Sequence, residues 1–256
     1  MVRRLFTPER RPHPVAVPAQ APAGRRIYVI GDIHGRADLL RQLHAKILAD
    51  AALHRDLQRV VVYLGDYVDR GLESRQVVDM LLDEPLPGFE QVLLLGNHEQ
   101  AMLDFLEDPG IGPAWLYYGG AATLYSYGIN AQARPPERVE RFPHLSAELG
   151  RLLPPRHLRF LRRLVLHHVE GDYLFVHAGI RPGLPIERQQ REDMLYIRDE
   201  FLNFSESHGR IVVHGHTITN DPDVRPNRIG IDTGAFATGR LTCLMLDGAE
   251  RRFIQT

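Results

Sequence analysis

The sequence contains one cysteine and has no long apolar run. Because Cys243 is alone among 256 residues, an intrachain disulfide is excluded, as is usual for a reducing cytoplasm. Cys243 stands in the apolar run 241–246, so we expect it to be a buried core residue. No run reaches the ~18 apolar residues of a spanning helix, and the N-terminus lacks the apolar segment of a secretory signal. We therefore expect a cytoplasmic protein without a membrane partner.

The sequence also lacks an excess of charge of either sign. Lys and Arg number 31 against 32 Asp and Glu, for a net charge of -1. General nucleic-acid binders usually carry a basic excess, so this balance argues against a nucleic-acid partner. Lys46 is the only lysine, so nearly all positive charge is arginine, whose planar fork can bind two phosphate oxygens. A biased genome composition explains this equally well, so phosphate binding can be assigned only to particular arginines.

The first 25 residues differ in composition from the rest of the chain. They combine arginines and prolines and have no apolar periodicity, which disfavours a helix or strand. We expect residues 1–25 to form a flexible tail and residues 26–256 to form one domain. The alternative is that residues 1–25 form an arm that docks on a partner or contacts another subunit. The sequence does not determine the oligomeric state.

Strands and helices alternate in the first part of that domain. Short apolar runs at 26–30, 59–64 and 91–95 indicate buried strands, and apolar residues at helical spacing fill 39–48 and 77–82 between them. This βαβαβ order predicts a mostly parallel sheet with right-handed crossovers.

The second part begins with a region, 100–163, that we expect to be helical with loops. Apolar runs then follow one another closely, which predicts a second, largely antiparallel sheet. These runs cover residues 165–169, 173–176, 211–213, 229–231 and 241–246.

Five polar clusters come directly after predicted strands. They are Gly31-Asp-Ile-His-Gly35, Gly65-Asp-Tyr-Val-Asp-Arg-Gly71, Gly96-Asn-His-Glu99, His177-Ala-Gly179 and His214-Gly-His-Thr217. Because ligands bind outside the carboxyl ends of strands in open α/β sheets, we expect these clusters to share one rim. Any one of them alone is more simply a polar turn or a structural histidine, but five in this order indicate a site.

Carboxylate, imidazole and amide groups together suit divalent Mn, Fe, Zn or Co. A closed structural zinc site is disfavoured because no thiolate is present. Six candidate ligands are too many for one catalytic ion that keeps an open position. The clusters therefore predict two ions that share a bridging carboxylate.

Three of these motifs carry a resemblance to a known family. Gly-Asp-x-His-Gly, Gly-Asp-x-Val-Asp-Arg-Gly and Gly-Asn-His-Glu are unbroken, and the resemblance covers about residues 27–246. The chain resembles the calcineurin-like metallophosphoesterases, and within them the bacterial and phage phosphoprotein phosphatases. The resemblance implies an α/β fold in which two mixed β-sheets pack as a sandwich flanked by helices. It also implies a dinuclear metal site at the carboxyl ends of the strands of this catalytic domain.

The resemblance assigns a role to each matching residue. The first metal is bound by Asp32 and His34, the second by Asn97, His177 and His216, and Asp66 bridges both. His98 resembles the general acid, Asp69 the carboxylate that orients it, and Arg70 and Arg198 the residues that bind the substrate phosphate.

Histidines outside this set need a separate interpretation. Related metallophosphoesterases often carry Gly-His-x-His in the last cluster, whereas this chain has Ile218 in place of the second histidine. The same departure occurs in phosphoprotein phosphatases, and it counts against the nuclease branches. We expect His214 to support its loop and His167 and His168 to be structural. Asp232 can be interpreted equally well as a residue that supports the metal site or as a residue that forms a turn.

The function implied is that of a metal-dependent phosphomonoesterase, specifically a protein serine/threonine phosphatase. It would use direct attack of a metal-bridging hydroxide and would act on phosphorylated proteins or small phosphoesters. We expect manganese as the metal, with Fe, Zn, Co or Ni as alternatives. The alternative enzyme is a symmetrical diadenosine-tetraphosphate hydrolase, whose members usually lack an Asp-Arg pair at Asp69 and Arg70. A binding protein with an inactive phosphatase fold is disfavoured because no ligand is lost.

Overall fold

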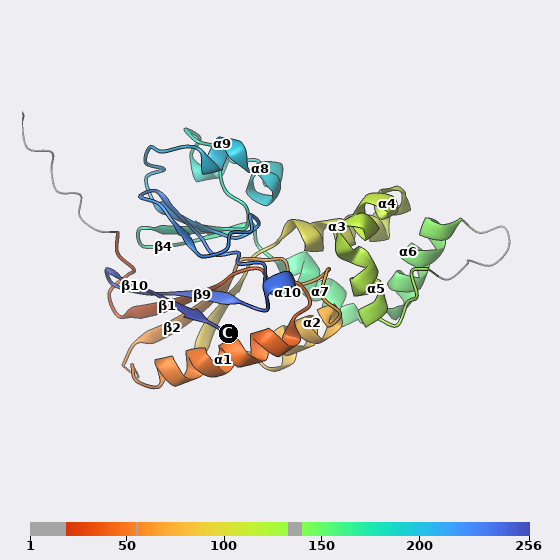
Figure 1. Cartoon of the computed structure of the whole chain (residues 1–256), viewed down its shortest axis with the longest axis horizontal. Coiled ribbons are helices and arrows are strands. Elements are labelled where there is room, and N and C mark those ends of the chain that lie inside the picture. The colour runs from red at the N-terminus through yellow and green to blue at the C-terminus, as the bar shows by residue number, and fades with distance from the viewer. Residues whose placement is uncertain (1–18, 55, 133–139) are drawn as a thin grey trace, which may run out of the picture.

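The computed structural model describes residues 19–54, 56–132 and 140–256, which form two five-stranded sheets with flanking helices (Figure 1). The strands are β1 (Arg25–Ile30), β2 (Gln58–Tyr63), β3 (Phe89–Leu93), β4 (His167–Glu170), β5 (Tyr173–Val176), β6 (Ile211–His214), β7 (Asp223–Val224), β8 (Arg228–Gly230), β9 (Thr242–Asp247) and β10 (Glu250–Gln255). The helices are α1 (Ala37–Ala51), α2 (Ser74–Asp83), α3 (Asn97–Glu107), α4 (Gly112–Trp115), α5 (Ala121–Ser126), α6 (Arg141–Leu152), α7 (Pro155–Arg163), α8 (Arg191–Tyr196), α9 (Asp199–Leu202) and α10 (Ala235–Thr238). Shorter turns are the 3₁₀ segments η1 (Pro109–Ile111) and η3 (Ile186–Arg188) and the π-helical η2 (Leu116–Gly120).

The first sheet has the strand order β10-β9-β1-β2-β3. The predicted βαβαβ unit is confirmed, because β1 pairs parallel with β2 and β2 pairs parallel with β3. On the other side β1 pairs antiparallel with β9, which in turn pairs antiparallel with β10. The run 241–246, which we expected in the second sheet, therefore belongs to the first. β10 had no counterpart among the predicted strands.

The second sheet has the order β4-β5-β6-β8-β7. The expectation that it is largely antiparallel is wrong for its centre, where β5, β6 and β8 run parallel. Only the outer pairs, β4 with β5 and β7 with β8, are antiparallel. The reason is that β5 and β6 are joined by a long connection that contains α8 and α9. This connection carries the chain back to the end of the sheet at which β5 begins, so β6 runs in the same direction as β5.

The two sheets pack face to face, so the predicted sandwich is confirmed. A buried cluster between them joins Val29 and Val62 of the first sheet to Phe175 and Val213 of the second. A larger cluster on the outer face of the first sheet includes residues of α1, α2, α3 and α6. A third cluster packs α8 and α9 on the outer face of the second sheet. In Figure 1 these two helices lie above the second sheet, α1 lies below the first, and α3 to α6 extend to one side.

The chain packs on the domain from Ala19, earlier than the expected boundary after residue 25. Ala21 is 4% exposed, and its N–H donates to Gly248 O at 2.8 Å. The Gln20 N–H donates to the Asp172 carboxylate at 2.9 Å. The part of the predicted tail from residue 1 to 18 lies outside the described residues, so its flexibility stays a prediction.

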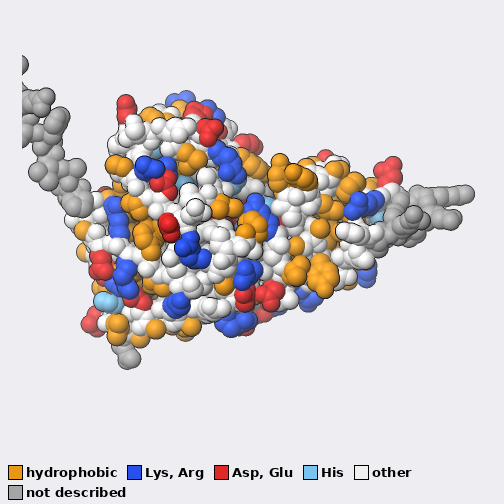
Figure 2. Space-filling model, viewed as in Figure 1, with side chains coloured by type: hydrophobic (Ala, Val, Ile, Leu, Met, Phe, Trp, Pro, Cys, Tyr) orange, Lys and Arg blue, Asp and Glu red, His pale blue; other side chains and the backbone are white. Residues whose placement is uncertain are grey.

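Basic and acidic side chains are interspersed over the face shown in Figure 2, as expected from the near-zero net charge. Among the described residues, no helix is long and apolar enough to cross a membrane. Cys243 is fully buried in β9, as predicted.

Candidate metal centre

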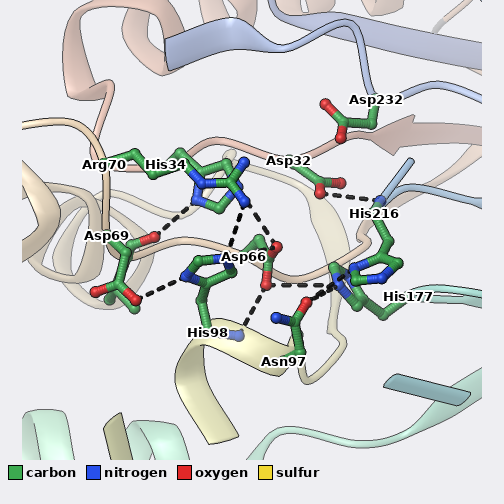
Figure 3. A network of polar contacts seen from close by, with 12 residues as sticks. Asp32, His34, Asp66, Asp69, Arg70, Asn97, His98, His177, His216 and Asp232 are labelled. Atoms are coloured by element: carbon green, nitrogen blue, oxygen red, sulfur yellow. Dashed lines mark hydrogen bonds and ion pairs between the residues drawn. The ribbon is translucent and has the colours of Figure 1, made fainter. Parts of the chain in front are cut away.

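The five polar clusters converge at the carboxyl ends of β1, β2, β3, β5 and β6, where the other five predicted ligands lie around the Asp66 carboxylate (Figure 3). Asp32 and His34 follow β1, Asp66 follows β2, and Asn97 starts α3 just after β3. His177 directly follows β5 and, with His216 after β6, lies beside Asn97. Residues far apart in the sequence thus meet because each follows a strand that ends at this rim.

The loops that carry these residues have unusual backbone conformations. The described residues other than glycine with a positive φ all lie in this region, and they are His34, Asp66, Asp69, Arg70 and His216. Such conformations are strained for residues with a side chain and concentrate at functional sites. The close approach of the loops also requires glycine, since a Cβ on Gly96 would lie 2.2 Å from Asp66 Oδ1.

Backbone carbonyls fix the orientation of two of the histidines. His34 Nδ1 donates to Val68 O at 2.9 Å, and His177 Nδ1 donates to Leu64 O at 2.9 Å. Each bond places the proton on Nδ1 and leaves Nε2 with a free lone pair facing the site. This is the arrangement in which histidine binds a metal ion.

Asp66 stands between two groups of candidate ligands. One group is His34, Asp66 and His98, and the other is Asp66, His177 and His216. His34 Nε2 lies 3.5 Å from Asp66 Oδ2, whereas His177 Nε2 lies 3.5 Å from Oδ1. The two oxygens of one carboxylate therefore face opposite groups, which is the geometry a bridging ligand needs.

Asn97 lies beside the second group, whereas Asp32 is a member of neither group. Asn97 Oδ1 lies 2.9 Å from both His177 Nε2 and His216 Nδ1. Asp32 Oδ2 accepts the His216 backbone N–H at 3.0 Å, and its Oδ1 is buried without a hydrogen-bond partner. His34 Nε2 and His216 Nε2 are likewise buried and unpartnered. Buried polar atoms normally have partners, so these orphaned atoms fit divalent metal ions at this site.

Electrostatics separate the ligand histidines from His98. Burial lowers the pKa of His34 to about 3, that of His216 to about 2, and also that of His177, so all three are neutral at pH 7. For His98 burial also lowers the pKa, but the Asp66 carboxylate and the hydrogen bond to Asp69 outweigh it and raise the pKa to about 8. The site therefore combines neutral imidazoles, the form that binds metal, with one imidazole that retains a proton.

Burial and two neighbouring carboxylates, Asp232 and Asp66, raise the pKa of Asp32. Burial raises the pKa of Asp232 to about 6. Several buried carboxylates this close together repel one another unless a cation lies between them. This excess of buried negative charge is a second observation that fits divalent metal ions.

Asp69 holds His98 and is itself held by the helical region. His98 Nδ1 lies 2.7 Å from Asp69 Oδ2, and Trp115 Nε1 donates to the same oxygen at 2.9 Å. Thr123 Oγ1 donates to Asp69 Oδ1 at 2.6 Å. Sequence reasoning missed Trp115 and Thr123. The only available signal was the segment of aromatic and glycine residues that begins at Trp115.

Glu99 is a third residue without a predicted role. Its carboxylate is fully buried and accepts four backbone N–H groups at 2.7 to 3.1 Å. The donors are Asp66, Tyr67, Val68 and Gly96. Burial and the Asp66 carboxylate raise the pKa of Glu99, and the N–H donors oppose this rise. Glu99 thus fastens the loop of the bridging carboxylate to the start of α3, and the motif Gly-Asn-His-Glu was its only sequence signal.

The two predicted phosphate-binding arginines lie beside the centre. Arg70 Nη2 is 3.2 Å from His98 Nε2, and Arg198 Nη1 is 3.4 Å from Thr217 Oγ1. Arg198 also lines a cavity of about 380 Å³ that opens at Asn97, His98 and His216. The rest of its wall is apolar or aromatic, formed by Ala101, Ile111, Ala114, Trp115, Tyr118 and Tyr196. A substrate group attached to a phosphate at the centre would lie against this wall.

The remaining candidates lie outside the two ligand groups. Asp232 lies beside Asp32 in Figure 3, and its Oδ1 accepts the Gly234 N–H at 2.9 Å. His214 contacts its own loop at Gly215 O, 3.1 Å away, and packs edge-on against Phe201. His168 lies 3.1 Å from Glu170 on β4, opposite Phe175 of β5.

Comparisons with known proteins agree with this fold. The family model of calcineurin-like phosphoesterases matches residues 25–237. A curated relative, the bis(5'-nucleosyl)-tetraphosphatase PrpE [asymmetrical] of Bacillus thuringiensis (strain Al Hakam), is 23% identical over 236 residues, covering 84% of this chain and 88% of that protein. The crystal structure of a candidate diadenosine tetraphosphatase has a TM-score of 0.58 at 21% identity, with 90% of this chain and 93% of the other covered. The cold-active protein-tyrosine phosphatase of a psychrophilic Shewanella species has a TM-score of 0.52 at 18% identity, with coverage of 92% and 83%.

The class defined by the sandwich and its site is that of the metal-dependent phosphoesterases. Because the family model spans most of the sequence, the chain belongs to the calcineurin-like phosphoesterase family.

Proposed function

We propose that this protein is a phosphomonoesterase with two divalent metal ions, and that phosphoserine and phosphothreonine peptides are its substrates. The observation that carries the proposal is the pairing of Arg70 with His98 beside the bridging carboxylate. The guanidinium lies 3.2 Å from His98 Nε2, and His98 is bonded to Asp69. A phosphate-binding cation and a proton donor thus face the same point.

In this proposal each ligand keeps the role implied by the family resemblance. The first ion would be held by Asp32 and His34 and the second by Asn97, His177 and His216, and Asp66 would be shared by the two. When bound, the ions activate a water molecule for attack on phosphorus and neutralise part of the phosphate charge. Manganese is the metal we propose, and a cytoplasmic location suits the single buried thiol.

His98 is the proposed general acid. A serine or threonine alkoxide is a strong base and needs a proton as it leaves. Because Asp69 accepts the proton on Nδ1, a protonated His98 carries its second proton on Nε2. Asp69 holds Nδ1 at 2.7 Å, so that Nε2 points towards the cavity and can donate to the leaving oxygen.

Charge distinguishes the proposed substrate from a dinucleotide. A phosphate monoester carries about two negative charges near neutral pH and has several free oxygens. Arg70 and Arg198 can bind the oxygens that the metal ions leave free, and arginine suits this because its N–H groups form a fork. An internal phosphate of a dinucleotide polyphosphate has substituents on both sides and offers fewer free oxygens. The arginine pair therefore favours monoesters.

Hydrolysis of a dinucleoside tetraphosphate is the second candidate. The observation in its favour is the similarity to curated relatives named bis(5'-nucleosyl)-tetraphosphatase [asymmetrical]. The activity in that name is the asymmetrical one, whereas the alternative expected from the sequence is the symmetrical hydrolase. The aromatic wall formed by Trp115, Tyr118 and Tyr196 is compatible with a nucleoside as well as with a peptide side chain.

Steady-state kinetics on three substrates test the proposal. The metal-loaded protein is assayed on a phosphoserine peptide, on diadenosine tetraphosphate and on 4-nitrophenyl phosphate at the same metal content. We expect kcat/KM for the peptide to exceed that for the dinucleotide. In Arg70→Ala we expect the peptide reaction to lose about 2.7–4 kcal/mol of transition-state stabilisation, as on removal of an oxyanion donor. A dinucleotide that is clearly the better substrate would overturn the choice of substrate.

A further inference from the structure

Phe236 contacts two residues of the metal centre although no motif of the sequence includes it. It lies in α10, the short helix after Gly234. Its ring meets the His34 ring edge-on, with centroids 5.5 Å apart and an angle of 86°. The Arg70 Cζ lies over the same ring, 4.7 Å from its centroid.

The environment of Arg70 differs from that of three arginines that pair with carboxylates. Arg26, Arg36 and Arg181 form ion pairs with aspartates at 2.6 to 2.9 Å. Within the part of the chain that the structure describes, Arg70 forms no ion pair with a carboxylate, and its Nη2 lies 3.2 Å from His98 Nε2. The side chains against its guanidinium are thus His98 and the Phe236 ring, while the buried carboxylates of Asp32 and Asp232 attract it from farther away.

An aromatic ring can hold a guanidinium without occupying its hydrogen-bond donors. The attraction acts between the positive charge and the negative face of the ring. The N–H groups lie in the plane of the guanidinium and stay free to bind a phosphate bidentately. A carboxylate in the same place would occupy those donors and neutralise the charge that the phosphate needs.

The ring itself stands on a fixed turn. Gly234, at the start of α10, has a left-handed φ of 66°. Arg36 Nη1 donates to Ala235 O at 3.0 Å, which ties α10 to the start of α1. Thr238 Oγ1 donates to Gly234 O at 3.0 Å. These contacts limit the movement of Phe236.

The backbone of Arg70 is fixed by Gly119, which lies in η2. Its φ is 67°, and its N–H donates to Gly119 O at 3.2 Å. A Cβ on Gly119 would lie 2.8 Å from both the backbone N and the Cγ of Arg70, so glycine is needed for this approach. With its backbone held by Gly119, the free end of Arg70 remains to be positioned by Phe236.

We propose that Phe236 is a positioning residue whose ring holds the Arg70 guanidinium ready for the substrate phosphate. The inference rests on the proposed phosphate-binding role of Arg70. Phosphate affinity would then depend on Phe236, a residue from a separate segment of the chain that does not itself contact the phosphate.

A double-mutant cycle tests this proposal. Inorganic phosphate is titrated calorimetrically into the metal-loaded wild type, Phe236→Leu, Arg70→Ala and the double variant, with metal content measured in each. We expect Phe236→Leu to weaken phosphate binding about three- to tenfold, the range of a partly buried cation–π contact. In the Arg70→Ala background the same substitution should have almost no effect. Phe236→Tyr should restore binding, and Phe253→Leu, a matched change on the exposed side of β10, should leave it unchanged.

Each other outcome has a separate meaning. An equal loss in both backgrounds, or no loss at all in Phe236→Leu, overturns the positioning role. Loss of metal in Phe236→Leu also overturns it, because the ring would then act through His34. Unchanged phosphate affinity in Arg70→Ala instead refutes the proposed phosphate-binding role of Arg70, whatever Phe236 does.

Discussion

Replacing Glu99 by glutamine should destabilise the protein. One carboxylate oxygen accepts the N–H groups of Tyr67 and Val68, and the other accepts those of Asp66 and Gly96. The amide of glutamine turns one acceptor into a donor, so two buried N–H groups lose their partner and face another N–H. Leaving a buried donor unsatisfied costs about 1–3 kcal/mol, so we expect a loss of roughly 2–5 kcal/mol in the free energy of unfolding.

The assay is urea denaturation at neutral pH of the wild type, Glu99→Gln and a control, Glu107→Gln. Glu107 ends the same helix with a side chain that is 74% exposed, so its substitution should change stability by less than ~0.5 kcal/mol. Metal content should fall in Glu99→Gln, because the loop of Asp66 loses its anchor. A Glu99→Gln protein that is as stable as the control would refute this explanation of how the loop is held.

Three further predictions follow from the same contacts. His98→Asn should keep both metal ions but slow the hydrolysis of alkyl phosphates much more than that of 4-nitrophenyl phosphate, because the leaving group of the latter hardly needs a proton. Stopped assays on both substrates measure this difference, and equal losses of activity would contradict the prediction. Trp115→Phe removes one hydrogen-bond donor to Asp69 and should lower the free energy of unfolding by about 1–3 kcal/mol, measured by urea denaturation. Phe105→Tyr, in the ring that packs on Trp115, shows how well this part of the core tolerates a substitution. Deleting residues 1–18 should leave the melting temperature nearly unchanged. Deleting residues 1–22 should lower the melting temperature, because the contacts of Gln20 and Ala21 are lost. Equal melting temperatures of the two shortened proteins would show that those contacts contribute nothing to stability.

Much of the first sheet and the placement of the site could be predicted because both depend on local patterns. Buried parallel strands are continuous apolar runs, and polar residues with glycine directly after them must lie at the carboxyl rim. The proximity of Asp32 and Asp66 follows from this rule, whereas His177 follows a strand of the second sheet and joins them because the two sheets pack face to face. Only side-chain coordinates, however, show that the two oxygens of Asp66 face different groups.

Other features could not be predicted because they depend on contacts between distant segments. The run that became β9 is apolar on both faces, so its pattern fits either sheet, and pairing with β1 decides the outcome. Trp115 and Thr123 reach Asp69 only after the helical region has folded onto the loop. The segment from Ala19 to Gly24 packs through single backbone hydrogen bonds, which have no periodic signature in the sequence.

The central claim is that two ions, bridged by Asp66, are required for phosphoester hydrolysis. The most direct measurement is turnover of 4-nitrophenyl phosphate during stepwise addition of Mn²⁺ to chelator-treated protein, with bound metal counted by elemental analysis. We predict no turnover in the metal-free protein and full turnover only when two ions per chain are bound. Full turnover without metal, or a maximum at one ion per chain, would contradict the claim.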